Sequence, residues 1–168
     1  MISSALFCLA ACDDPAPPEP PHDVVATLTK ETPLTERRWL ELKDKVSPAL
    51  WLASREAGRD LDERAPEVAR IRASIATADA RFTEGPRMIA NRAVQVQEML
   101  AENGVREAPS VVIESLASLA TEADGERAGF GETCQHYVTS RISGLSREDT
   151  LAALRRTPLP AAKPGGER

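Results

Sequence analysis

Apolar residues recur at intervals of three and four along much of the chain, the spacing that gathers side chains on one side of an α-helix. Four such stripes run through Val68, Ile71, Ile75, Ala78 and Phe82; Ile89, Ala93, Val96 and Leu100; Val112, Leu116 and Leu119; and Phe130, Cys134, Tyr137, Val138 and Ile142. Residues that start or stop helices separate the stripes, at Gly85-Pro86, Gly104, Pro109 and Gly144. Each stripe is therefore predicted to form an amphipathic helix.

A further helix is predicted ahead of these stripes. Thr35 is a suitable N-cap, because Leu34 precedes it and Trp39 follows at the fourth helical position, the layout of a hydrophobic staple. The stripe then continues through Trp39, Leu42, Val46 and Leu50. Ser47-Pro48 interrupts it and indicates either a kink or a new helix, with serine as cap and proline at the first position. Gly58 is expected to end that piece.

The last predicted helix has the clearest boundaries. Ser146 is placed to cap it, and Leu151 and Leu154 would face the core. Charges of the sign that the helix dipole favours lie in its first and last turns, at Glu148, Asp149, Arg155 and Arg156.

Five or six amphipathic helices with short connections predict an all-α fold, an antiparallel bundle over residues 24–156. The chain of 168 residues is long enough for one hydrophobic core. Residues 24–30 (VVATLTK) fit either a strand or an extended arm. Residues 157–168, with three prolines and two glycines, are predicted to be a frayed tail.

The N-terminus contains Leu9-Ala10-Ala11-Cys12 after an apolar run without charges. This pattern resembles the lipobox of bacterial lipoproteins, in which two small residues precede a cysteine. The resemblance covers only the first dozen residues. It implies that residues 1–11 are a signal peptide and that Cys12 carries a diacylglyceryl thioether and further acyl chains such as palmitate. The sequence departs from a typical signal because no Lys or Arg precedes the apolar run, which leaves open whether Met1 is the natural start. The alternative is a buried apolar N-terminus with an incidental cysteine.

Residues 12–23 are predicted to be a tether. Residues 13–21 contain five prolines, which favour the semi-rigid polyproline II conformation. No run reaches the roughly 20 apolar residues needed to span a bilayer, so lipid would be the anchor. By resemblance to enterobacterial lipoproteins, Asp13 slightly favours retention in the inner membrane, with the domain in the periplasm.

Charge and cysteine content narrow the functional classes. The net charge is −5 with both signs mixed along the chain, which argues against nucleic-acid binding and against a polybasic membrane patch. Cys8 would leave with the signal peptide and Cys12 would be lipidated. Only Cys134 would remain, so no intrachain disulfide is expected.

Two clusters could suggest chemistry in the second half of the chain. Cys134 and His136 are two residues apart, which on a helix separates them by about 200°, so they are predicted not to form a metal site or a catalytic pair. Gly129-Phe130-Gly131 lacks the preceding strand and the following lysine of a phosphate cradle. A tight turn between helices is the preferred interpretation.

Three other features allow more than one interpretation. Asp60-x-Asp62-Glu63 lacks the glycine and terminal glutamate of a calcium loop and is predicted to be a solvated helix start. The amides of one helix flank, Asn91, Gln95 and Gln97, can satisfy each other or a partner's backbone, although such a flank is most often solvated. Trp39 and Trp51 are predicted to anchor the core, and an exposed tryptophan would instead mark a contact surface.

Catalytic residues, metal ligands and cofactors are predicted to be absent, since no motif for any of them was found. The predicted function is that of a membrane-anchored envelope lipoprotein whose bundle binds another protein as a scaffold, adaptor or assembly factor. A small envelope enzyme or a ligand-binding helical domain is the alternative. A polar-lined pocket with several converging titratable groups would favour that alternative. The partner and the oligomeric state stay open.

Overall fold

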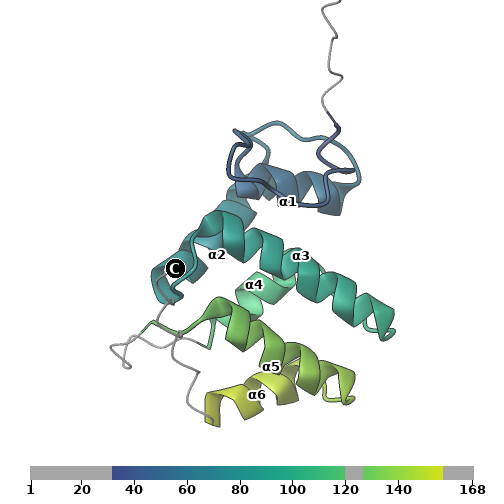
Figure 1. The fold of residues 1–168 in the computed structure, drawn as a ribbon, viewed down its shortest axis with the longest axis vertical. Helices are drawn as coiled ribbons and strands as arrows, with labels where there is room; N and C mark the ends of the chain where they lie inside the picture. Colours follow the sequence, from purple (N-terminus) through teal and green to yellow (C-terminus); the bar gives the residue numbers. More distant parts are fainter. Residues whose placement is uncertain (1–31, 120–126, 157–168) are drawn as a thin grey trace, which may run out of the picture. The chain divides into compact units, whose positions relative to one another are not determined.

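The computed structural model describes residues 32–119 and 127–156. In these two ranges the chain forms six helices: α1 (Pro48–Ala57), α2 (Pro66–Arg81), α3 (Pro86–Glu102), α4 (Pro109–Ala117), α5 (Phe130–Ile142) and α6 (Arg147–Arg156) (Figure 1). The only β-type pairing there is an isolated parallel bridge between Phe82 and Ala128. The predicted all-α helical bundle is confirmed. The predicted signal peptide, tether, residues 24–30 and tail lie outside the described residues.

Proline marks the start of the first four helices. α1, α2, α3 and α4 each have proline at the first helical position, where the missing N–H costs nothing because no intrahelical acceptor is available to it. The sequence predicted that Pro109 opens a helix and gave a new start at Pro48 as one of two interpretations, whereas Gly85-Pro86 was predicted only to separate two helices. Gly58 adopts the left-handed conformation with φ of 65° directly after α1, and so confirms the predicted end of that helix.

The predicted helix from Thr35 through Val46 is wrong. Residues 34–36 form a turn and the chain then runs without regular structure to Ser47, which caps α1 by accepting a hydrogen bond from the Leu50 N–H at 3.1 Å. Proline disfavours the helical conformation in the residue before it, and Ser47 is extended, with ψ of 141°. Ser47-Pro48 is therefore a new start and not a kink.

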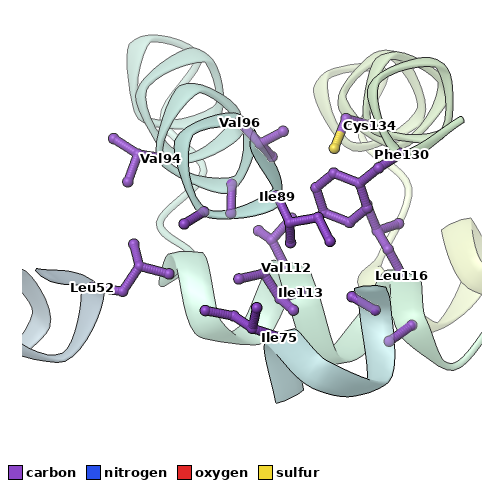
Figure 2. Packing of buried hydrophobic residues seen from close by; sticks show 14 of the residues in the cluster. Leu52, Ile75, Ile89, Val94, Val96, Val112, Ile113, Leu116, Phe130 and Cys134 are labelled. Atoms are coloured by element: carbon purple, nitrogen blue, oxygen red, sulfur yellow. The ribbon is translucent and has the colours of Figure 1, made fainter. Parts of the chain in front are cut away.

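The predicted stripes form one continuous core. α2 packs against α1, α3 and α4; α3 packs also against α4 and α5; and α6 packs against α5. Figure 2 shows the apolar side chains of α2, α3, α4 and α5 meeting around Ile89, Val112 and Phe130. Every predicted stripe residue of α2, α3 and α4 is buried, together with Leu119. In α5 the prediction fails at Ile142, which is exposed because it lies in the helix's last turn.

α6 begins as predicted. The Ser146 hydroxyl accepts the Asp149 N–H at 3.0 Å, and the acidic first turn and basic last turn match the helix dipole. Leu151 and Leu154 pack against the core but are only partly buried.

Two helices without N-caps of their own receive carboxylates from elsewhere. The residues preceding α4 and α5 are Ala108 and Gly129, which make no side-chain cap. Glu56, at the end of α1, accepts the N–H of Ser110 at 2.8 Å and its hydroxyl at 2.9 Å. A charged acceptor at a helix N-terminus is favoured both by hydrogen bonding and by the helix dipole.

Glu84 caps α5 in the same way. Its two carboxylate oxygens accept the N–H groups of Phe130 at 2.7 Å and Gly131 at 2.8 Å. Partial burial by itself would raise the pKa of the Glu84 carboxyl, but the hydrogen bonds from Gly131 and Phe130 outweigh it and hold the pKa below its ordinary value. The connection between α2 and α3 is thereby fixed to the start of α5.

We expect Glu84→Gln to lower the free energy of unfolding by about 1 kcal/mol at pH 7, because the amide keeps one acceptor and loses the charge. Since the folded-state pKa of Glu84 is lowered, the carboxylate stabilises the fold above its unfolded pKa of about 4.3. That contribution is lost as the pH falls through the folded value. Urea denaturation should therefore show that the free energies of unfolding of the wild type and of Glu84→Gln differ at pH 7 and differ less at pH 3. Glu102→Gln, at an exposed carboxylate, is the control. An equal effect of both substitutions would contradict the cap.

Candidate functional site

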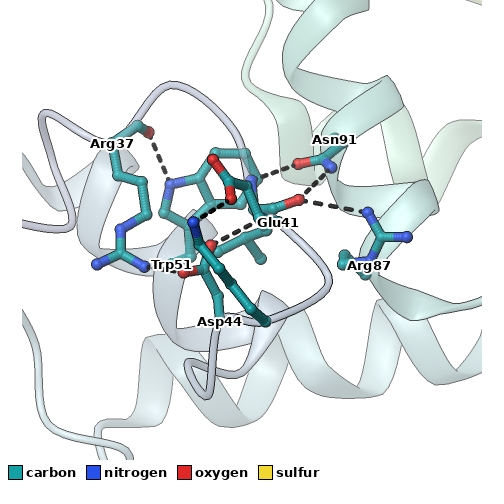
Figure 3. A network of polar contacts seen from close by, with 8 residues as sticks. Arg37, Glu41, Asp44, Trp51, Arg87 and Asn91 are labelled. Carbon is teal, nitrogen blue, oxygen red and sulfur yellow. Dashed lines mark hydrogen bonds and ion pairs between the residues drawn. The ribbon is translucent and has the colours of Figure 1, made fainter. Parts of the chain in front are cut away.

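The segment before α1 is held on the bundle by side chains that bind its backbone. We call residues 32–47 the strap. The Asn91 side chain pairs with both backbone groups of Leu40: its Oδ1 accepts the Leu40 N–H at 3.0 Å, and its Nδ2 donates to the Leu40 carbonyl at 2.9 Å (Figure 3). Arg87 donates to the same carbonyl at 3.3 Å. Asn91 thus makes the same pair of hydrogen bonds with Leu40 that the backbone of a neighbouring β-strand would make.

A second attachment lies three residues earlier in the strap. The Arg37 carbonyl accepts the indole N–H of Trp51 at 2.9 Å and a guanidinium N–H of Arg55 at 3.0 Å. Trp51 is completely buried, and the Arg55 guanidinium lies 5.4 Å from the centre of its ring. The prediction that Trp51 anchors the core is confirmed.

The strap also has hydrogen bonds of its own. Arg37 forms an ion pair with Asp44 at 2.9 Å, and the other carboxylate oxygen of Asp44 accepts the Glu41 N–H at 2.7 Å (Figure 3). Leu40 is directed into the core and is 2% exposed. The backbone on both sides of Leu40 is therefore fixed in place.

Leu40 points into the core, whereas two other large apolar side chains of the strap are exposed to solvent. Trp39 is 37% exposed and Leu42 is 87% exposed. The prediction that Trp39 anchors the core is wrong, because its neighbour Leu40 takes the inward position. Arg38 lies over the Trp39 ring at 5.4 Å and pairs with Glu98 of α3 at 3.2 Å.

We call Arg38, Trp39, Leu42 and the exposed Glu41–Lys43 ion pair the Trp39/Leu42 surface. Exposed apolar side chains held on a fixed backbone, with charges of both signs around them, are typical of protein contact sites. Sequence reasoning missed Leu40 and Asn91, whose pairing spans 51 residues. The amide-rich flank was the one available signal, since Asn91 does satisfy a backbone.

Cys134 lies in α5 with its thiol directed into the core beside Phe130 (Figure 2), and it is 5% exposed. His136 is exposed, so the predicted separation of the two side chains is confirmed. Burial raises the pKa of the Cys134 thiol far above its ordinary value, and the negative charge of Glu84 acts in the same direction. A protonated, buried thiol is a poor nucleophile.

The other candidate clusters are structural. Asp60 accepts the Leu34 N–H at 3.0 Å, Asp62 accepts the Arg64 N–H at 2.9 Å, and Glu63 pairs with Arg72 at 3.0 Å. Among the described residues, no group of three or more His, Cys, Asp or Glu side chains could hold a metal ion. At Gly129-Phe130-Gly131 the N–H groups that could receive a phosphate already bind Glu84.

A buried carboxylate that the sequence did not indicate joins α5 and α6 to the segment before α4. Glu107 accepts the Tyr137 hydroxyl at 2.6 Å and pairs with Arg141 at 3.3 Å and Arg147 at 3.9 Å. Burial, followed by the hydrogen bond to Glu107, raises the pKa of Tyr137, so its hydroxyl keeps its proton at neutral pH. The cluster is internally satisfied, which fits a structural role.

The described part of the chain is thus a small helical bundle with two exposed apolar side chains, Trp39 and Leu42, on its strap. None of its helices is long and apolar enough to cross a membrane. The MoxZ family model matches residues 49–158, and the chain belongs to this family. Protein MoxZ of Paracoccus denitrificans is 29% identical over 155 residues, which cover 89% of this chain and 86% of that protein. No solved structure matches the chain.

Cys134→Ala should leave function intact and lower the free energy of unfolding by about 1–2 kcal/mol, because it removes only buried sulfur contacts. Dithionitrobenzoate should label Cys134 slowly in the folded protein and rapidly in denaturant. The absorbance of the released thiolate, at a wavelength of about 412 nm, measures the extent of labelling. Stoichiometric labelling of the native domain within seconds, accompanied by loss of function, would contradict this.

Proposed function

We propose that this member of the MoxZ family is a non-enzymatic accessory protein that binds another protein through the Trp39/Leu42 surface. The observation that carries the proposal is the exposure of Leu42 on a strap whose backbone is fixed at Leu40 and Arg37. An apolar side chain 87% exposed gains nothing from the fold itself. Its burial against a partner would contribute on the order of 1.5–3 kcal/mol.

The fixed backbone favours binding in a second way. A surface that is ordered before it meets its partner loses less conformational freedom on binding. Tryptophan and arginine are the residues that most often dominate the energy of protein contacts, and Arg38 already lies over Trp39. Because both signs of charge surround the apolar pair, we expect the affinity to depend only weakly on salt.

We propose further that this protein serves methanol oxidation. Membership of the MoxZ family supports an accessory role in that system. The partner would then be a protein component of the same system, in or facing the periplasm.

We also propose that the protein acts at the envelope side of the inner membrane. The resemblance of Leu9-Ala10-Ala11-Cys12 to a lipobox supports a lipid anchor on Cys12, and the proline-rich residues 13–21 would serve as spacer. Two or more acyl chains are needed for stable anchoring, which a lipidated N-terminal cysteine supplies.

Replacing both outward residues tests the contact surface. Trp39→Ala combined with Leu42→Ala should abolish chemical cross-linking to the partner and slow growth on methanol, while growth on a multicarbon substrate stays normal. The free energy of unfolding should fall by about 1–3 kcal/mol, because Trp39 is only 37% exposed, but the fold should stay intact because neither side chain belongs to the core. A native-host strain carrying only the variant gene, with thermal melts of the purified protein, provides the measurements.

The matched control replaces the other exposed apolar pair at the end of α5, Ile142 and Leu145, by alanine. These side chains are about as exposed as Trp39 but lie outside the strap. Equal growth defects from the two double substitutions would show that general loss of apolar surface, and not the strap, is responsible.

The anchor has its own test. Cys12→Ser should release the protein from the membrane fraction or leave it as unprocessed precursor, because the thioether requires sulfur. Fractionation followed by immunoblotting measures this. Mass spectrometry that found unmodified Met1 on the mature protein from the native host would rule out the lipid anchor.

A further inference from the structure

The last helix, α6, is weakly attached to the rest of the bundle. We propose that α6 is a hinged flap, which detaches from α5 as a unit while α1 to α5 stay folded. Local opening of this kind is expected where a segment has few buried apolar side chains and weak polar contacts. The flap is a different part of the chain from the Trp39/Leu42 surface, and its opening does not depend on the proposed function.

Little of α6 is buried. Thr150 is the one buried residue among its 10, whereas α4, with 9 residues, buries Pro109, Ser110, Val112, Ile113, Ser115, Leu116 and Ala117. Leu151 and Leu154 are only partly buried, and α6 packs mainly against α5 (Figure 1). Because the free energy gained from packing grows with the apolar area removed from water, the packing of α6 stabilises its attachment only slightly.

The one residue that α6 buries is held there at a cost. Thr150 is completely buried, but its hydroxyl has no hydrogen-bond partner among the described residues. Such a hydroxyl is more stable in water, where it can form hydrogen bonds, so burying it favours the open form. Thr133 of α5 is equally buried, and its hydroxyl donates to the Gly129 carbonyl at 2.7 Å. The closed position of α6 therefore carries a penalty that Thr133 does not impose on α5.

Two polar contacts between α6 and the rest of the described chain are long. Arg147 approaches the Glu107 carboxylate at 3.9 Å, and Arg155 approaches the Ser118 hydroxyl at 3.4 Å. The side chain of Arg147 is 49% exposed, and ion pairs that water reaches contribute little to stability. Both contacts can therefore be lost with little effect on the free energy of the bundle.

Opening would leave the neighbouring elements intact. Glu107 would keep its hydrogen bond from the Tyr137 hydroxyl at 2.6 Å and its ion pair with Arg141 at 3.3 Å, so its buried charge would not be left without a partner. Arg141 also donates to the Leu145 carbonyl at 2.6 Å, and Gly144, with φ of 93°, completes the end of α5. The rotation would therefore take place after Leu145, between the fixed end of α5 and the first turn of α6.

Amide hydrogen exchange of the full-length protein, followed residue by residue by NMR, tests the flap. We expect the amides of α6 to share one protection factor, at least about 100-fold lower than that of the buried amides of α3. Thr150→Val should raise the protection of α6 about tenfold, because it keeps the shape of the side chain and removes the hydroxyl that lacks a partner.

The matched control is Thr133→Val, which removes a buried hydroxyl that has a partner. It should lower the protection of α3 about fivefold, because it weakens the whole bundle, and leave that of α6 unchanged, because α5 stays folded in the open form.

Three results would overturn the proposal. If the amides of α6 are as well protected as those of α3 and lose protection with them in Thr133→Val, α6 unfolds only with the whole bundle. If protection declines steadily towards Arg156 while the Thr150 amide is as protected as those of α5, the end of the helix frays and there is no flap. If Thr150→Val leaves the protection of α6 unchanged or lowers it, the buried hydroxyl does not favour opening.

Discussion

The N–H groups at the buried starts of helices need hydrogen-bond acceptors, and in this small bundle that requirement determines which parts of the chain are held together. The first N–H groups of a helix have no partner inside it, and α4 and α5 lack a capping side chain of their own. Glu56 and Glu84 satisfy these groups from earlier parts of the chain. Glu56 thereby attaches α4 to α1, and Glu84 attaches α5 to the connection between α2 and α3, so that the same hydrogen bonds that satisfy the backbone also hold these elements together.

The backbone groups of the strap also need hydrogen-bond partners, and side chains supply them. Its backbone is neither helical nor paired in a sheet, so side chains of α1 and α3 take the place of a neighbouring strand. Leu40 points into the core, whereas Trp39 and Leu42 are exposed. The attachment that buries Leu40 therefore also leaves exposed the side chains of the surface that we propose for partner binding.

Helices and their limits could be predicted from the sequence because they depend on near neighbours. The stripes of α2, α3 and α4 are buried as predicted, and Pro109 begins a helix as predicted. The same local reasoning failed at Thr35, where a capping residue and helical spacing were present. It failed because both backbone groups of Leu40 bind the Asn91 side chain in place of helical partners.

The sequence by itself determined the class of fold, some of the helix ends, such as Gly58 after α1 and Ser146 before α6, and the separation of Cys134 from His136 on different sides of one helix. Only the tertiary structure decided which carboxylate meets which helix end, that Glu107 binds Tyr137, and that Leu40 and not Trp39 enters the core. These partners lie 30 to 54 residues apart. Local spacing fixes which face of a helix is apolar, but contacts at such separations depend on how those faces pack together, which no single stretch of sequence specifies.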